Sequence, residues 1–312
     1  MVCPSSTLEK NMKSIIERGL IGLSNAGVLN GGNWFVGHFG AEVLSLAFLL
    51  LNKRIEKSAE SLVYERIDTV LKTHSQFFET PLPIQNAATS LRLNDFEKKV
   101  ENSISNLYVD GHHTIYSALA LRGLSEYPEL ARPEIIHGLI GLVDACKAAG
   151  FDRYYGLENK SFEDKYLIEN FTFKSALTAA EASFSQHCEV ITDREADGAF
   201  YFFSGSRLHL VTHAQALLEL HQIGYSNLAK IGLSSFTKHC ICVNASAVPH
   251  GAQPYKIEQK FDPRHASFWQ RAKTNPHHGK LAYAVLEIFA ASGQASEENV
   301  LKDLSAYWEF YE

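Results

Sequence analysis

Apolar residues recur along most of this chain at the spacing of an amphipathic α-helix. Leu8, Met12, Ile15, Ile16 and Leu20, for instance, fall near one helical face. The same periodicity predicts helices over residues 8–20, 41–51, 56–73, 95–107, 113–124, 133–149, 208–222, 226–239, 263–274, 278–291 and 297–311, and a further helix over 163–184 that could break. Residues typical of helix ends agree with several of these ranges. Pro133 suits a first turn, and Gly150, Gly224 and Gly293 follow apolar helices, where positive φ is common.

Alternating patterns typical of β-strands are scarce. The best strand candidates, 199–203 and 240–243, are short, and residues 244–260, which contain two prolines and a glycine, are predicted to form a long loop. No Gly-, Ser- or Pro-rich linker divides the chain. We therefore predict an all-α fold in which one large multi-helix domain spans residues 1–312, with its helices packed around a central histidine-lined site.

Composition agrees with a soluble helical domain. Hydrophobic residues make up 46% of the 312 positions, enough for a substantial core. The net charge of −6 is scattered, and no basic cluster interleaves with aromatic residues, so we expect no nucleic-acid partner. The longest apolar run, 43–51, is far shorter than the roughly 20 residues of a membrane span, and residues 1–13 lack the apolar core of a signal peptide. We expect a cytoplasmic protein without a membrane partner.

The cysteines indicate neither a disulfide framework nor a favoured metal site. Five cysteines without framework spacing indicate reduced thiols in a cytosol. His239, Cys240 and Cys242 could bind a soft metal, but Cys-x-Cys lacks the usual two-residue spacing, so we favour a buried helix end. The pair His187 and Glu189 could open a metal triad, but it lies among polar residues and is not favoured.

The histidines, in contrast, recur in similar surroundings. His38, the pair His112–His113, the pair His209 and His213, and the pair His277–His278 each stand at or near the start of an apolar helix, and His137 lies early in another. A helix that is apolar on most faces lies inside the domain, so a histidine at its start points near the core and needs a partner there. Such helices packed around one centre would bring imidazoles together, which suits Fe, Zn, Cu or Mn. The alternative is that each histidine is a capping, surface or hydrogen-bonded core residue.

The order and context of these stretches resemble the questin oxidase-like family. Gly111-His112-His113-Thr-Ile-Tyr-Ser-Ala-Leu resembles the family's Asn-His-Gly-Pro-Met-Ala stretch, and Leu208-His209-Leu-Val-Thr its Leu-His-Ala-Val-Thr stretch. His137-Gly-Leu-Ile resembles a His-Ala-Leu-Ile-type helix, and His277-His-Gly-Lys280-Leu resembles the family's His-Val-Ile-Lys-Leu stretch. Gly111 stands where the family has Asn, and the Gly-Pro-Met sequence is absent.

This resemblance implies a helical fold and, in part of the family, a non-haem iron centre with several histidines and a lysine carboxylated on its amine. At the matching positions of this sequence, the resemblance implies five ligands, which are His38, His112, His209, His277 and Lys280. A lysine desolvated near a cation has its pKa lowered, and the neutral amine can add CO₂ to become an anionic oxygen ligand. The alternative for Lys280 is an ordinary solvated lysine on a helix face.

We therefore expect an Fe(II)-dependent oxygenase, with Zn or Mn as alternative metals, that uses O₂ on an aromatic, quinone-like or polyketide-type small molecule. His137 or His213 would orient a ligand or transfer a proton. Candidate pocket walls are Phe35, Phe39, Tyr116, Tyr201, Phe202, Trp269 and Tyr283.

Other functions stay open. An NADPH-dependent Baeyer–Villiger type oxidase would need an atypical nucleotide site, because no Gly-x-Gly-x-x-Gly is present. A zinc hydrolase would need a carboxylate base, for which Glu42, Asp110 and Asp197 are candidates. The last alternative is a non-catalytic helical binding protein.

Overall fold

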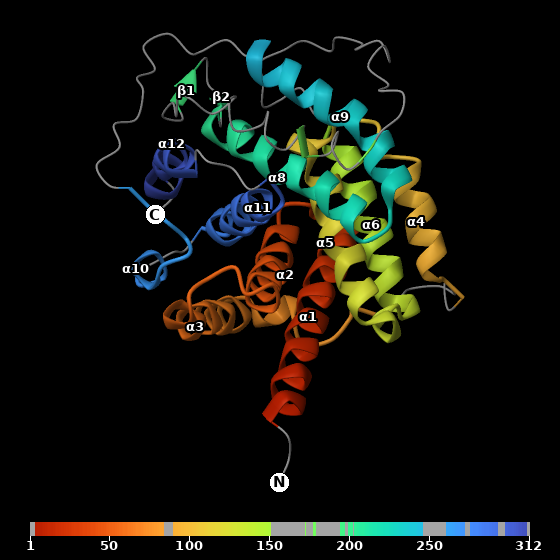
Figure 1. The fold of residues 1–312 in the computed structure, drawn as a ribbon. Helices are drawn as coiled ribbons and strands as arrows, with labels where there is room; N and C mark the ends of the chain where they lie inside the picture. The colour runs from red at the N-terminus through yellow and green to blue at the C-terminus, as the bar shows by residue number, and fades with distance from the viewer. Residues whose placement is uncertain are drawn as a thin grey trace.

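Helices account for most of the described chain (Figure 1). The computed structural model describes residues 4–83, 90–150, 203–245, 260–271, 275–292 and 297–310, with short pieces at 172, 177–178, 194–196 and 199–201. The helices are α1 (Pro4–Val28), α2 (Gly37–Leu51), α3 (Lys57–Thr73), α4 (Leu93–Glu101), α5 (His112–Glu126), α6 (Pro133–Ala149), α8 (Phe203–Gln222), α9 (Ser226–Ala245), α10 (Ala266–Trp269), α11 (His277–Ser292) and α12 (Glu297–Phe310). Short 3₁₀ turns lie at Leu29–Gly31, Ser75–Phe77, Val109–Gly111 and Pro128–Leu130, and β1 (Arg194–Ala196) pairs antiparallel with β2 (Ala199–Tyr201).

The predicted all-α fold is confirmed, and most predicted helices lie within a few residues of their observed bounds. The strand predicted at 199–203 corresponds to β2, but the strand predicted at 240–243 is wrong, because these residues continue α9. Ala229, Leu233, Phe236 and Val243 are all buried at helical spacing, so burial along one face outweighs the local β-propensity. The helix predicted over 263–274 is reduced to the short α10. Most of 163–184 and of the predicted loop 244–260 lies outside the described residues.

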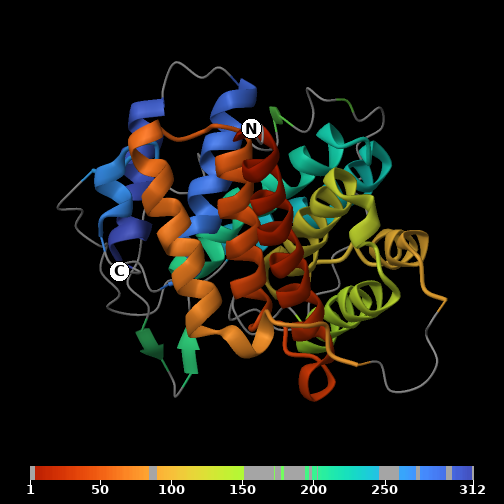
Figure 2. The ribbon, with the colours of Figure 1, turned by 90° about the horizontal axis from the view of Figure 1, so that it is seen from below.

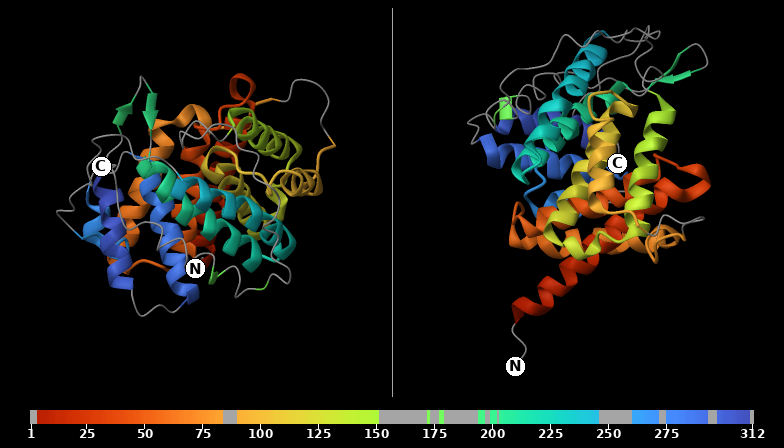
Figure 3. Two further views of the ribbon diagram at one scale, coloured as in Figure 1. Left: turned by 90° about the horizontal axis from the view of Figure 1, so that it is seen from above. Right: turned by 90° about the vertical axis from the view of Figure 1, so that its right-hand side faces the viewer.

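Four buried helices surround the centre of the fold. Helix α2 packs against α5 and α11, and α8 packs against the same two helices, so the four form a closed ring. Helices α1 and α3 flank α2, and the three lie side by side in Figure 2. Helix α9 covers α8, and α6 packs on α1, while the N-terminal end of α1 extends beyond the other helices (Figure 3). In the described part of the chain, no helix has both the length and the apolar character needed to cross a bilayer.

Helices α1 and α6 cross with their backbones in contact. A Cβ added at Gly27 would lie 1.8 Å from the Gly138 carbonyl oxygen, and one added at Gly138 would lie 2.1 Å from the Ser24 hydroxyl oxygen. Neither backbone can move away without separating the helices, so this crossing needs glycine on both sides.

Substituting Gly138 with alanine is expected to lower the free energy of unfolding by about 3 kcal/mol, because the added methyl group overpacks this crossing. The matched control is Gly123→Ala on α5, where an added Cβ meets only side chains, at 3.2 Å and beyond. There, the higher helix propensity of alanine, worth about 1 kcal/mol, offsets the strain. Thermal unfolding of both variants measures the difference, and equal midpoints would show that the helices do not cross as closely as described.

Candidate metal centre

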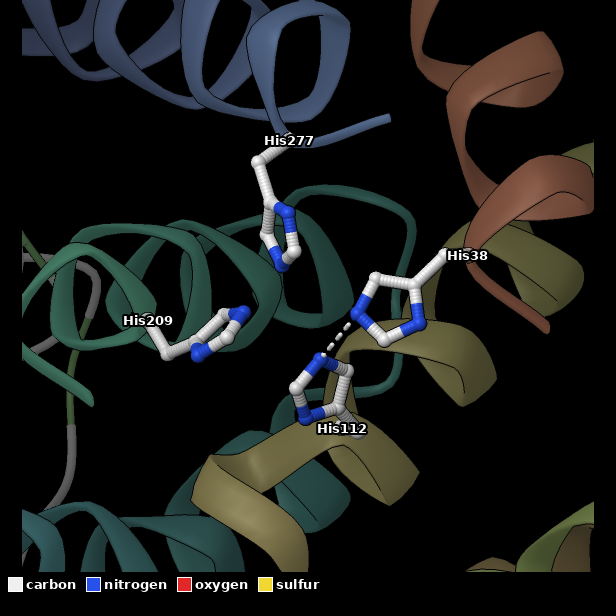
Figure 4. A group of neighbouring side chains, drawn as sticks. All are labelled: His38, His112, His209 and His277. Carbon is white, nitrogen blue, oxygen red and sulfur yellow. Dashed lines mark hydrogen bonds between the residues drawn. The ribbon is translucent and has the colours of Figure 1, made fainter. Parts of the chain in front are cut away.

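Four histidines from the four central helices meet at one point (Figure 4). His38 lies in the first turn of α2, His112 and His277 are the first residues of α5 and α11, and His209 lies on α8. One ring nitrogen from each lies within 4.8 Å of those of the others. His38, His112 and His209 are buried, whereas His277 is partly exposed. The predicted gathering of these histidines at the centre is therefore confirmed, but His209 lies inside α8, six residues after its first residue, rather than at a helix start.

Each imidazole has an acceptor on its Nδ1 side. The Nδ1 of His38 lies 2.8 Å from the Phe35 carbonyl oxygen, and that of His112 contacts the Val109 carbonyl oxygen. The Nδ1 of His277 lies 2.6 Å from the Asn275 Oδ1 atom, which also accepts the His277 backbone N–H. The acceptors are the outer partners that orient histidine ligands in metal sites.

At His209 the partner is a carboxylate. Its Nδ1 lies 3.6 Å from the Asp110 Oδ2 atom, and neither ring nitrogen of His209 makes a hydrogen bond. Asp110 is itself buried, so its charge is little screened by water.

Hydrogen bonds determine the tautomer of three of the rings. Carbonyl oxygens only accept hydrogen bonds, so the Nδ1 atoms of His38, His112 and His277 carry the protons. The Nε2 atom of a neutral imidazole then has a lone pair and no proton. The Nε2 atoms of His38 and His112 lie 2.9 Å apart, so two lone pairs face each other. Two ligand nitrogens at about 2.1 Å from one metal ion, at right angles, are separated by about 3 Å. The spacing therefore fits a cation between the rings.

Burial keeps these imidazoles neutral. It is the largest cause that holds the pKa of His38, His112, His209 and His277 well below the ordinary value for histidine. The neighbouring charge of Lys280 lowers the pKa of each ring further. Neutral imidazole is the form that ligates metals.

A strained turn places two of the outer partners. Val109, Asp110 and Gly111 have φ values of 40°, 56° and 79° in succession. Left-handed backbone is costly for a β-branched residue, on the order of 1–3 kcal/mol. Glycine is required at the third position, because a Cβ at Gly111 would lie 2.5 Å from the His213 ring. The turn directs the Val109 carbonyl to His112 and the Asp110 carboxylate towards His209.

Lys280 lies one turn along α11 from His277. Its side chain is 2% exposed, and its Nζ atom makes no hydrogen bond. Burial lowers the pKa of Lys280 to about 7, with Glu42 acting in the opposite direction. Glu42, one turn after His38, is buried and pairs with Arg66 at 2.8 Å. The alternative that Lys280 is a solvated lysine is wrong, because its ammonium group is buried.

The neighbouring histidines turn away from this point. His113 lies against the Tyr108 ring, and the Nε2 of His278 lies 2.9 Å from the Trp308 carbonyl oxygen. His213 lies one turn from His209 and is buried, with its ring facing His239 at 3.2 Å. His137 lies partly exposed on α6 and does not belong to the group.

Two of the predicted pocket walls, Phe35 and Tyr116, lie at the histidine cluster. Trp34, which sequence reasoning missed, lies 5.1 Å from the His112 ring and 5.7 Å from the His38 ring. Phe35 lies 4.8 Å from His38 and is 55% exposed. The Tyr116 hydroxyl lies 2.9 Å from the His38 Nδ1 atom and donates to the Trp34 carbonyl oxygen.

Other predicted walls lie elsewhere. Phe39 stacks on His74, the Trp269 indole donates to the Pro263 carbonyl oxygen, and Tyr283 bonds to Glu219. The side chains of Tyr201 and Phe202 lie outside the described residues.

Comparison of the chain with family models, curated proteins and solved structures finds no match.

Proposed function

We propose that this chain is a non-haem Fe(II)-dependent oxygenase that acts on an aromatic, quinone-like or polyketide-type small molecule, as its resemblance to the questin oxidase-like family implies. His38, His112, His209 and His277 would hold the iron. The observation that carries the proposal is the convergence of four imidazoles, three of which donate from Nδ1 to an oxygen and so keep their Nε2 lone pairs for a cation. Imidazole donors suit iron, zinc and copper.

The charge of the site favours an anionic ligand beside the histidines. Four neutral imidazoles leave the charge of a divalent ion uncompensated, and the positive ends of α2, α5 and α11 lie at the cluster. Lys280 supplies the compensation if its neutral amine attacks CO₂, forms an N–C bond and releases a proton, which leaves a carbamate. With that carbamate, the four imidazoles and Lys280 would together hold the metal ion, and the ion would supply the chemistry with O₂.

The chain's own residues would admit and orient the substrate. His277 is the partly exposed member of the cluster, and its ring contacts that of His38, which in turn contacts the rings of Trp34 and Phe35. A flat aromatic substrate would stack on these rings. The bound iron would supply the oxidising chemistry with O₂. His213, buried one turn from His209, is better placed for proton transfer than the partly exposed His137.

The alternative functions fit less well. For a zinc hydrolase, Asp110 faces the Nδ1 edge of His209 rather than the centre, Glu42 pairs with Arg66, and Asp197 lies outside the described residues. For an NADPH-dependent oxidase, the sheet within the described residues is an antiparallel pair of three-residue strands, unlike the parallel strand-helix-strand unit that holds dinucleotides. In a helical protein that binds no metal, the Nε2 lone pairs of His38 and His112 would face each other with no cation between them, which is unfavourable.

Metal analysis tests the proposal. We expect protein purified anaerobically, without an affinity tag or a metal column, to contain about one iron ion per chain, as a single cluster of imidazoles requires. Only the iron-loaded protein should consume O₂ when polyhydroxylated aromatic or quinone compounds are added. Zinc alone with ester or amide hydrolysis would indicate the hydrolase. Absence of stoichiometric metal, with melting unchanged by a chelator, would overturn the metal site itself.

A further inference from the structure

A second buried polar cluster joins the same four helices at a distance from the histidines. We call it the distal network, and it consists of Asn52, Arg122, Glu219, Tyr283 and Glu287. Three members, Glu219, Tyr283 and Glu287, are at most 3% exposed. Charged residues are rarely so buried unless they are paired, and none of these residues belongs to the metal centre.

The network is hydrogen-bonded throughout. The Arg122 guanidinium donates to Glu219 and, at 2.9 Å, to the Asn52 side-chain oxygen. Asn52 in turn donates to Glu287 at 2.8 Å, and the Tyr283 hydroxyl donates to Glu219. These contacts join α5, α8 and α11 with Asn52, the residue that follows α2.

Each histidine has a network member further along its own helix. Arg122 follows His112 by ten residues, just as Glu219 follows His209 and Glu287 follows His277. Asn52 follows His38 by 14 residues. Ten helical residues correspond to about 15 Å. The four histidines meet at one place and the four network residues that follow them meet at another. The four helices therefore run in the same direction from the histidine cluster to the distal network.

We infer that the distal network is a positioning device for the histidine cluster. Moving one helix by a single residue shifts it by about 1.5 Å and turns it by about 100°. Metal ligands must be placed to within about 0.2 Å, so such a shift would remove one imidazole from the site. Apolar contacts are non-directional, so they specify the alignment of neighbouring helices less sharply than hydrogen bonds do. A buried hydrogen-bonded network is satisfied in one alignment only, because any other alignment leaves a buried charge without its partner.

The test compares two tyrosines that make the same kind of bond. Tyr283→Phe removes the hydroxyl that donates to Glu219, whereas Tyr225→Phe removes a hydroxyl that donates to Glu97 at 2.6 Å, outside the four helices. Metal-free protein labelled with ¹⁵N-histidine is measured by NMR, with the four cluster histidines assigned by single substitutions. We expect Tyr283→Phe to shift the ring-nitrogen signals of His209 and His277, and Tyr225→Phe to leave them in place. Glu219→Gln, nearly identical in shape, provides a second network variant with the same expectation.

Metal binding, which rests on the proposed function, measures the same effect in a second experiment. We expect Tyr283→Phe to weaken Co(II) binding by roughly tenfold and to change the Co(II) absorption spectrum, as residues coupled to a site without touching its ligand do. Tyr225→Phe should bind within about twofold of the natural sequence, the spread expected for a distant independent site. Ring-nitrogen signals unmoved by both network variants would overturn the inference, even if metal binds. Shifted signals in a protein that binds no metal would support it and overturn the proposed function alone.

Discussion

Replacing His112 with alanine is expected to weaken Fe(II) or Co(II) binding by roughly 100- to 1000-fold, taking one ligand as about a quarter of the 10–16 kcal/mol that a buried metal site supplies. His112 is central to the cluster, because its ring lies 4.2 Å from the ring of His209 and 4.5 Å from that of His38. A smaller side chain also leaves the Val109 carbonyl without its donor. Competition against a chelator of known affinity measures the loss.

The matched control is its neighbour. His113→Gln alters an equally buried histidine on the same turn, whose pKa is lowered to about 4 by burial, but whose ring faces Tyr108. It should lower stability and leave metal affinity within about threefold, because it touches no ligand. At a metal concentration about 1000 times the dissociation constant, binding stabilises the natural protein by about 4 kcal/mol, and His112→Ala should lose most of this gain in melting experiments. Equal effects of the two substitutions would contradict the assignment of the ligands.

The sequence could predict the gathering of histidines but not which neighbour of each pair takes part. The apolar surroundings of His112 and His277 show that their helices start in the core. Adjacent residues, however, differ by about 100° around a helix axis, so the choice between His112 and His113 depends on how the helix is rotated against its neighbours. Packing of the whole ring determines that rotation, and no short stretch of sequence contains it.

The partners that orient the rings were harder to predict. Asn275 stands two residues before His277, a common helix-start arrangement, so a local signal existed. The turn at 109–111 has none, because Val109 in a left-handed conformation contradicts its own preference and is held there by the surrounding fold. The sequence signal of the distal network can be recognised only once the structure is known. Arg122, Glu219 and Glu287 are charges on the buried sides of largely apolar helices, ten residues after a histidine.

Lys280 is expected to reduce the stability of the metal-free protein. Its Nζ atom is buried without a hydrogen bond near four neutral imidazoles, and the charge of Glu42 offsets only part of the cost of burial. Replacing it with methionine, of similar length, should raise the free energy of unfolding of the metal-free protein by about 1–4 kcal/mol. Denaturant titration measures the gain. Lys238→Met on α9 is the control, because that lysine is also mostly buried but donates to the Ser105 carbonyl oxygen at 3.4 Å, and its removal should bring no gain.

The same position should be essential once metal is present. Lys280→Ala and Lys280→Met should both lose most of their metal affinity, because the anionic ligand that compensates the charge of the ion is gone. Lys280→Glu should restore binding in part, since a carboxylate supplies the charge on a shorter side chain, and restoration should not depend on added bicarbonate. Binding by the natural protein should depend on bicarbonate, because its carbamate forms from CO₂. A Lys280→Ala variant that keeps full metal content and unchanged stability would show that this lysine is not a ligand. A buried lysine that lowers the stability of the metal-free protein but completes the metal site shows the trade-off between stability and function that is expected of a functional residue.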